Sequence, residues 1–237
     1  MSKLLMFLFC CSLWASCAFA YPSTYLFGGS QPDGNSGQVL ELQLSDGSMY
    51  LASTRKSPIG AEKGAENFGW WDTKIGHILG NYNYFAGYNS IYDSIFHNFF
   101  SFDLSGLVGT VNSATIKLAP YAASHPFTAM RYELFDVSTP AQDLLLKSGI
   151  NQVIFSDLAS GKSYGSFNVI SDPSVLSEIS ISLSSSAIFD INNRRAKYFS
   201  IGGAVNQIPE PSTIYMLLLG MFFIASSRIG RKNSLIA

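Results

Sequence analysis

Short segments in which apolar and polar residues alternate recur through the central part of this 237-residue chain. The clearest covers 178–184, where Ile179, Ile181 and Leu183 alternate with three serines. A period of two places successive side chains on opposite faces of a β-strand, so one face is buried and the other is exposed. The best segment with a helical period, 142–147, is short. The pattern therefore predicts a chain built from β-strands with little helix.

Five further segments are predicted strands, and several of them end at Ser, Asp or Gly residues that form turns. They are 38–44, 100–104, 110–118, 131–137 and 198–201. The predicted core face of the third holds Asn112, Ala114, Ile116 and Leu118. Many short strands at near-regular spacing are typical of an antiparallel β-sandwich, commonly a jelly-roll in exported proteins. We therefore expect an all-β, jelly-roll-like domain over 21–207; a solenoid would need a repeat of fixed length, which the sequence lacks.

The first 20 residues have the parts of a signal peptide. Lys3 gives a positive start, and an apolar run to Ala15 follows it. Ala18 and Ala20 then form the small-x-small pattern that signal peptidase cleaves. We therefore predict an exported protein whose mature chain starts at Tyr21.

All three cysteines lie inside this removable segment, at Cys10, Cys11 and Cys17. The mature body therefore has no disulfide, no thiol nucleophile and no thiolate metal site, and its core alone must hold it together. Lipoprotein processing at Cys17 is an alternative to ordinary cleavage. It is disfavoured because Trp14 stands where the lipoprotein motif usually has leucine.

The chain ends, over 208–237, in a proline-rich motif, an apolar run and a few basic residues. The defining residues are Pro209, Glu210, Pro211, Ser212 and Thr213, followed after the apolar run by Arg228, Arg231 and Lys232. The uncharged stretch 211–227 would rise about 25 Å as a helix, against a bilayer core of about 30 Å. We predict a minimal transmembrane helix over 212–227, with the basic end 228–237 in the cytoplasm.

This tail resembles the PEP-CTERM sorting signal of bacterial surface and matrix proteins. The resemblance implies recognition by an exosortase, a membrane cysteine protease, with cleavage near 209–211. It also implies a transient inner-membrane anchor, followed by delivery to the cell surface or an exopolysaccharide matrix. The basic cluster is sparser than the family pattern. A plain C-terminal anchor without processing is the alternative, and hydropathy alone does not separate the two.

Several blocks of the body also resemble recurring blocks of PEP-CTERM-sorted proteins, which are similar to modules related to carbohydrate-binding jelly-rolls. The blocks are 98–107, 109–118, 132–139, 155–158 and 199–203. They cover about half of the mature chain. The resemblance implies a jelly-roll fold and leaves the ligand open.

Aromatic residues are concentrated between Phe68 and Phe102. Sugar rings present apolar C–H faces that lie flat on exposed aromatic rings, so we name four candidate glycan-binding residues. They are Trp70, Trp71, Tyr82 and Tyr84. In an extended strand, adjacent Trp70 and Trp71 point to opposite faces, which sends one ring outward. The alternative is that these aromatics fill the core, an interpretation that we favour for Phe85, Phe99, Phe100 and Phe102.

The remaining composition argues against several classes of function. The body carries eleven Lys and Arg against fifteen Asp and Glu, about −4, with no basic patch for a nucleic acid. G-x-S-x-G and H-E-x-x-H motifs are absent. The histidines His77, His97 and His125 are too far apart for a compact metal motif, and we predict no cofactor.

These observations predict a non-catalytic exported protein, structural or glycan-binding, with signal peptidase, exosortase and extracellular polysaccharide as partners. The alternative is a divergent polysaccharide-active enzyme of the glycoside hydrolase or lyase type. Its paired carboxylates would meet in space and leave no sequence motif.

Overall fold

The computed structural model describes residues 23–29, 38–56, 58–59, 66–81, 83–125, 130–169, 178–193 and 197–207. Its strands are β1 (Thr24–Gly29), β2 (Val39–Leu44), β3 (Met49–Ser53), β4 (Phe68–Asp72), β5 (Asn83–Asn89), β6 (Ser94–Asp103), β7 (Val111–Leu118), β8 (Pro120–Ser124), β9 (Met130–Asp136), β10 (Ser163–Val169), β11 (Ile179–Ser182) and β12 (Tyr198–Gln207). Its helices are α2 (Ala141–Leu146), α3 (Gln152–Asp157) and α4 (Ser185–Asn193). The predicted signal peptide with Ala18 and Ala20, the sorting tail 208–237 and Tyr82 lie outside the described residues.

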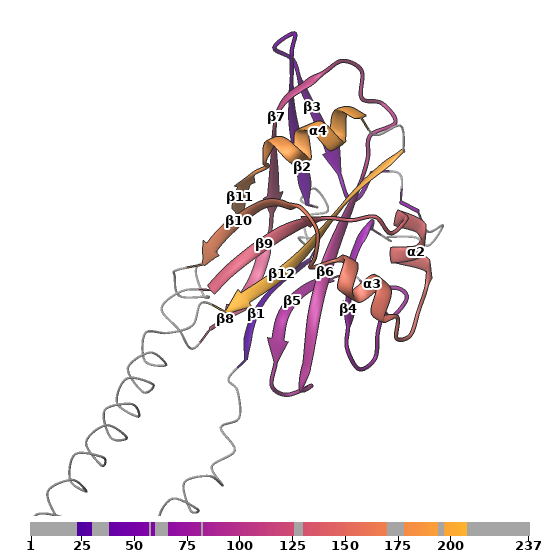
Figure 1. Cartoon of the computed structure of the whole chain (residues 1–237), viewed down its shortest axis with the longest axis vertical. Helices are drawn as coiled ribbons and strands as arrows, with labels where there is room; N and C mark the ends of the chain where they lie inside the picture. Colours follow the sequence, from indigo (N-terminus) through magenta and orange to yellow (C-terminus); the bar gives the residue numbers. More distant parts are fainter. Residues whose placement is uncertain are drawn as a thin grey trace, which may run out of the picture.

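The strands form two antiparallel sheets (Figure 1). The larger has the order β10-β9-β12-β6-β5-β1-β8, with β4 paired to β6, and the smaller has the order β11-β7-β2-β3. This arrangement confirms the predicted all-β class and is consistent with a sandwich. Within the described ranges, no helix combines the length and the apolar character needed to cross a bilayer.

Alternation assigned a buried face to two predicted segments, which correspond to β7 and β11, and most of that assignment is confirmed. Ile179 and Ile181 are buried in β11 and the serines beside them are exposed, as expected. In β7 the prediction failed at one end, because Val111 is buried and Asn112 is exposed. The pairing of β7 with β2 shifts register between Gln43 and Leu44. Such an irregularity adds a residue to one strand and reverses the inward and outward positions beyond it.

Helices are more frequent than the sequence pattern predicted. The segment 142–147 corresponds closely to α2, whereas α3 and α4 were not predicted. The side chain of Asn151 caps α3 by accepting hydrogen bonds from the backbone N–H groups of Val153 and Ile154. Both missed helices are short and have narrow apolar faces, so their formation depends on the sheets against which they pack.

Two hydrophobic cores lie on opposite faces of the larger sheet. The main core fills the space between the two sheets and includes Phe100 and Phe102 of β6. The second core lies beneath α2 and α3, which Figure 1 shows beside β4 and β6, and it includes Trp71 and Phe99. Phe99, Phe100 and Phe102 are all fully buried, which confirms their predicted place in the core.

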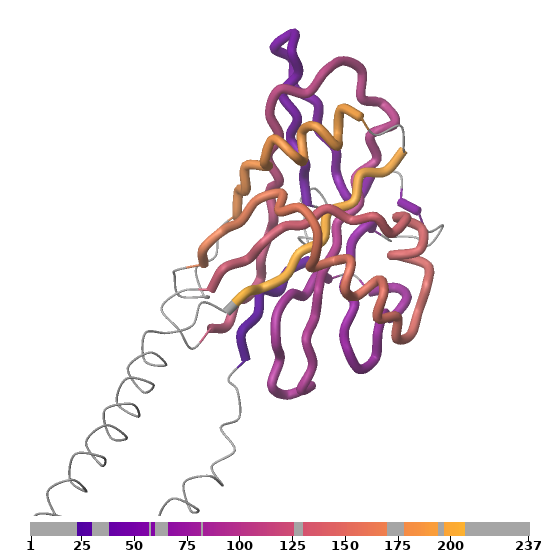
Figure 2. The backbone as a smooth tube through the Cα atoms, viewed as in Figure 1, coloured from indigo at the N-terminus to yellow at the C-terminus, as the bar shows by residue number. Residues whose placement is uncertain are grey.

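Strand β6 changes its partner along one edge. Residues 94–96 pair with β5, whereas residues 98–103 pair with β12, and β4 occupies the opposite edge. Strand β5 therefore leaves β6 soon after the turn that joins them. In Figure 2 the β5–β6 hairpin and the loop that follows β4 reach the same end of the molecule. These two connections frame the candidate site.

Candidate functional site

The adjacent tryptophans of β4 have opposite environments. Trp71 is fully buried, its Nε1 donates to the carbonyl oxygen of Leu144 at 3.1 Å, and its ring stacks on His77 with centroids 5.2 Å apart. Trp70 is half-buried on the other face of the strand. Trp70 is therefore the ring that can meet a ligand, and Trp71 belongs to the core beneath the helices.

Tyr84 is also fully buried, which removes it as a candidate glycan contact. Its ring lies edge-on against Phe68 and Phe100, and its hydroxyl has no hydrogen-bonding partner in the described part of the chain. Burial raises the pKa of Tyr84 well above its ordinary value. The alternation of β5 turns the neighbouring Phe85 outward, so the prediction that Phe85 belongs to the core is wrong.

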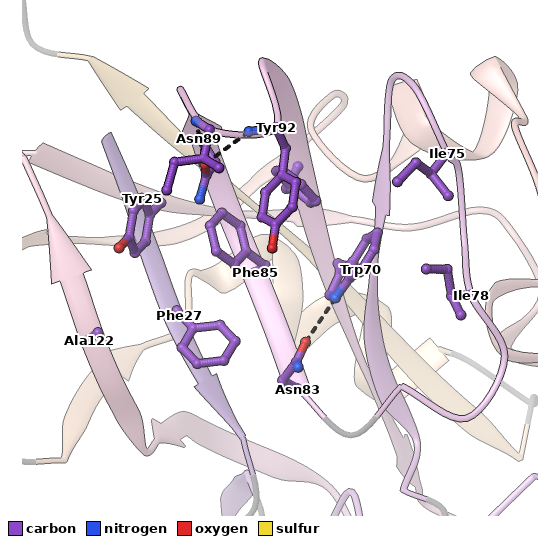
Figure 3. A pocket seen from close by; sticks show the side chains of 12 residues that line it. Tyr25, Phe27, Trp70, Ile75, Ile78, Asn83, Phe85, Asn89, Tyr92 and Ala122 are labelled. Atoms are coloured by element: carbon purple, nitrogen blue, oxygen red, sulfur yellow. Dashed lines mark hydrogen bonds between the residues drawn. The ribbon is translucent and has the colours of Figure 1, made fainter. Parts of the chain in front are cut away.

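An apolar hollow of about 500 Å³ lies beside Trp70 (Figure 3). We call it the aromatic trough, and the described residues that line it are Tyr25, Phe27, Trp70, Ile75, Ile78, Asn83, Phe85, Asn89, Ile91, Tyr92, Phe96 and Ala122. They come from β1, β4, β5, β6 and β8 and from two connecting loops. Its volume is within the range of about 300 to 1,000 Å³ that is typical of small-ligand sites.

The rings of the aromatic trough form a continuous band. The centroid of Phe85 lies 4.8 Å from that of Tyr25 and 4.5 Å from that of Phe96. The centroid of Phe96 lies 5.1 Å from that of Trp70, in an edge-on arrangement. Figure 3 shows Tyr25 and Phe85 on one side and Trp70 on the other, with Tyr92 between them. Contacts of this kind stabilise one ring arrangement and leave few rotamers to be lost on binding.

Two asparagines supply the amide groups of the lining. Asn83 Oδ1 accepts a hydrogen bond of 2.8 Å from the Trp70 indole, which holds that ring in place. Asn89 Oδ1 accepts bonds from the backbone N–H groups of Ile91 and Tyr92, which shapes the β5–β6 turn. None of the described lining residues carries a charge.

A buried carboxylate organises the loop that presents Ile75 and Ile78. Asp72 Oδ1 accepts hydrogen bonds from the backbone N–H groups of Lys74, Ile75 and Gly76, at 3.1, 2.6 and 2.6 Å. Asp72 Oδ2 accepts a bond from the hydroxyl of Ser94 at 3.2 Å. These four hydrogen bonds offset the free-energy cost of burying the carboxylate. They also fix the position of the loop that forms one wall of the aromatic trough.

The same loop is anchored to the segment between α2 and α3. The N–H of His77 donates to the carbonyl of Gly149 at 3.1 Å, and the N–H of Gly149 donates back at 3.0 Å. Gly76 has φ of +82° and lies so close to the Gly149 backbone that a Cβ would collide with it. This position therefore requires glycine for both its conformation and its space.

Two histidines lie on the helix-covered side of the sheet. Burial lowers the pKa of His77, whose Nδ1 donates to the carbonyl of Trp70 at 2.8 Å. Burial likewise lowers the pKa of His97, whose ring stacks on Phe155 and whose Nδ1 donates to the Phe155 carbonyl. Both rings are held neutral near pH 7 and serve packing.

Two further carboxylates of the described ranges have local structural partners. Asp46 and Asp103 each accept a backbone N–H two residues ahead, at Ser48 and Ser105, and so cap turns. The described residues contain no group of three or more His, Cys, Asp or Glu side chains placed to hold a metal ion.

The sequence analysis missed Tyr25, Phe27 and Phe96 as members of the site. A signal existed, since Tyr25 and Phe27 alternate with Leu26, which is fully buried. The pairing of β1 with β5, which sets Phe27 opposite Phe85, is what brings these rings together. Comparisons of the chain with protein-family models, curated proteins and solved structures found no match.

Proposed function

We propose that this chain is an exported, non-catalytic protein that binds a glycan through the aromatic trough, at the cell surface or in an exopolysaccharide matrix. The observation that carries the proposal is the band of aromatic rings that lines the hollow around Trp70, most of them partly exposed. The C–H face of a sugar ring is apolar and packs on such rings, while polar side chains bind its substituents. The jelly-roll relationship that fits this role rests on the resemblance of the sequence blocks.

Binding is favoured over catalysis by the composition of the lining. Hydrolysis of a glycosidic bond in most enzymes requires two carboxyl groups about 5 to 10 Å apart on either side of the bond. No Asp or Glu is among the described residues that line the aromatic trough. The carboxylate of Asp72, two residues after Trp70, is buried and engaged by four donors. The alternative of a divergent polysaccharide-active enzyme therefore gains no support from this site.

Binding can be tested by affinity electrophoresis of the purified full chain in gels that contain the host's own polysaccharide. We expect Trp70→Ala to weaken retardation about tenfold, because one stacking ring is worth roughly 1.4 kcal/mol. Phe189→Ala is the matched control, since Phe189 is an exposed ring on α4 outside the aromatic trough. Equal retardation of wild type and Trp70→Ala would contradict the proposal.

The sorting part of the proposal rests on the motif from Pro209 to Thr213 and on the resemblance to the PEP-CTERM signal. An exosortase would cleave near the motif and release the body from a transient inner-membrane anchor. We expect Glu210→Ala to leave the precursor in the inner-membrane fraction. Glu178→Ala, which changes an exposed carboxylate of the body, is the control. Normal release of the Glu210→Ala protein would reject sorting without affecting glycan binding.

A further inference from the structure

We infer that the aromatic trough selects a neutral glycan that carries acetyl groups. This inference rests on the proposed function and adds the chemical class of the ligand. It follows from the hydrogen-bonding capacity that the two asparagines retain after their contacts within the protein. It also follows from the absence of charge among the described lining residues.

The orientation of each amide is fixed by its partners. The indole Nε1–H of Trp70 can only donate, so the atom of Asn83 that faces it must be Oδ1. Asn89 faces two backbone N–H groups, of Ile91 and Tyr92, so Oδ1 must face them as well. Neither Nδ2 group has an acceptor among the described residues. Both asparagines therefore direct their donors away from their protein contacts.

The hydrogen-bonding capacity that remains on the two asparagines contains many more donors than acceptors. The two amide groups keep four N–H donors, while Asn89 Oδ1 has both lone pairs occupied and Asn83 Oδ1 has one left. The hydroxyls of Tyr25 and Tyr92 add equal numbers of donors and acceptors. A ligand that fits this lining must accept more hydrogen bonds than it donates.

An acetyl group has this character. Its carbonyl oxygen only accepts, and its methyl group suits the apolar surface made by Phe27, Ile75 and Ile78. A bare sugar hydroxyl would also bring a donor, and a buried donor without an acceptor costs about 1 to 3 kcal/mol. The acetyl group satisfies the asparagine donors without this penalty.

Charged sugars have no counterpart in the aromatic trough. A uronic acid would need a cation and a free amino sugar would need a carboxylate, and the described lining has neither. Lys74 and Asp93, which are adjacent in sequence to the lining residues Ile75 and Tyr92, form an ion pair of 2.7 Å in which the two charges compensate each other. Removing an acetyl group from an amino sugar would therefore lose an acceptor and introduce an unpaired cation.

The test compares acetylated and deacetylated forms of one glycan by titration calorimetry with the purified full chain. One arm uses a β-linked N-acetylglucosamine hexamer and its fully de-N-acetylated form. The other uses an O-acetylated neutral xylan before and after mild alkali. We expect deacetylation to reduce affinity at least tenfold in the arm whose linkage fits. Equal or tighter binding of the deacetylated form would overturn the acetyl inference and leave glycan binding intact, whereas binding in neither arm would overturn both.

Variants of the two asparagines provide a second readout. Asn83→Asp and Asn89→Asp keep an oxygen for the Trp70 indole and for the turn, but they replace the free donors with a carboxylate oxygen. Each should abolish or reverse the preference for the acetylated form. Asn151→Asp makes the same change at the cap of α3, outside the aromatic trough, and should leave the preference unaltered. An undiminished preference in folded Asn83→Asp, verified by circular dichroism, would overturn the inference.

Discussion

Strands β4 and β5 each carry two adjacent aromatic residues with different roles, one buried in a core and one lining the aromatic trough. Trp71 and Tyr84 are fully buried, whereas their neighbours Trp70 and Phe85 line the aromatic trough. The inner rings contribute to the free energy of folding by removing apolar surface from water. The outer rings remain partly hydrated and can exchange that water for a ligand. Strand alternation thus separates stability from binding within a few residues.

The largest predicted difference in stability is between substitutions of Trp71 and of Trp70. Trp71→Ala should lower the free energy of unfolding by about 3 to 5 kcal/mol, because it leaves a cavity and an unpaired Leu144 carbonyl. Trp70→Ala should cost roughly 1 to 2 kcal/mol of stability while it weakens glycan binding about tenfold. Urea unfolding of the full chain measures both values. Similar losses of stability in the two variants would contradict the division between the faces.

Asp72 tests whether the outer face depends on the interior. Asp72→Ala should reduce stability by about 2 to 3 kcal/mol, because it leaves the N–H groups of the loop after β4 without their acceptor. The variant should also weaken binding, since Ile75 and Ile78 lose their fixed position. Asp46→Ala removes an exposed carboxylate with the same local turn-capping role and should cost less than about 1 kcal/mol. Urea unfolding and glycan titration of both variants measure the two effects, and equal losses in Asp72→Ala and Asp46→Ala would contradict the prediction.

Acid pH should destabilise the core beneath α2 and α3 and leave glycan binding unchanged. Burial lowers the pKa of His77 and of His97 in the folded protein, so the unfolded chain binds more protons below about pH 6.5. The two neutral histidines therefore contribute their full share to the free energy of unfolding above that pH. This contribution is lost as the pH falls, by up to about 1.4 kcal/mol per pH unit for each histidine. Glycan binding at pH 6 should equal that at pH 8, because the described lining has no group that titrates there. Parallel losses of stability and of glycan binding would indicate that the core beneath the helices and the aromatic trough are coupled.

The smallest effect concerns two buried tyrosines. Tyr84→Phe removes a buried hydroxyl that has no partner among the described residues and should raise stability by about 1 kcal/mol. Tyr132→Phe is the matched comparison, because the Tyr132 hydroxyl donates to Asn98 Oδ1 at 2.9 Å. It should lower stability by about 1 to 2 kcal/mol. Opposite signs in thermal denaturation are expected, and a loss in both variants would argue against an unsatisfied Tyr84 hydroxyl.

Sequence patterns predicted about half of the strands, such as the segment around Ile179 and Ile181, and did not identify β1, β3, β4, β5, β8 and β10. They failed where a local irregularity or a second layer changes the environment. Asn112 was assigned to the core because alternation was extended through a register shift that only strand pairing reveals. The helix containing Phe155 was missed because its amphipathic pattern spans less than two turns.

The site was predictable only in part. Aromatic density and the adjacency of Trp70 and Trp71 indicated that one indole faces outward, but they did not say which. Phe85 was assigned to the core because a phenylalanine in a strand is usually buried. Phe85 lies opposite Phe27 in the aromatic trough because β5 pairs with β1, a long-range contact that no local pattern encodes.

The sequence by itself determined the all-β class, most of the buried faces of β7 and β11 and the concentration of aromatic residues, because these depend on local periodicity and composition. It also carries the terminal patterns on which the sorting proposal rests. Only the tertiary structure decided which rings meet in the aromatic trough, which amide oxygens are engaged and which donors remain. These properties arise from pairing between strands far apart in the chain, where the position of each side chain depends on its neighbours in space.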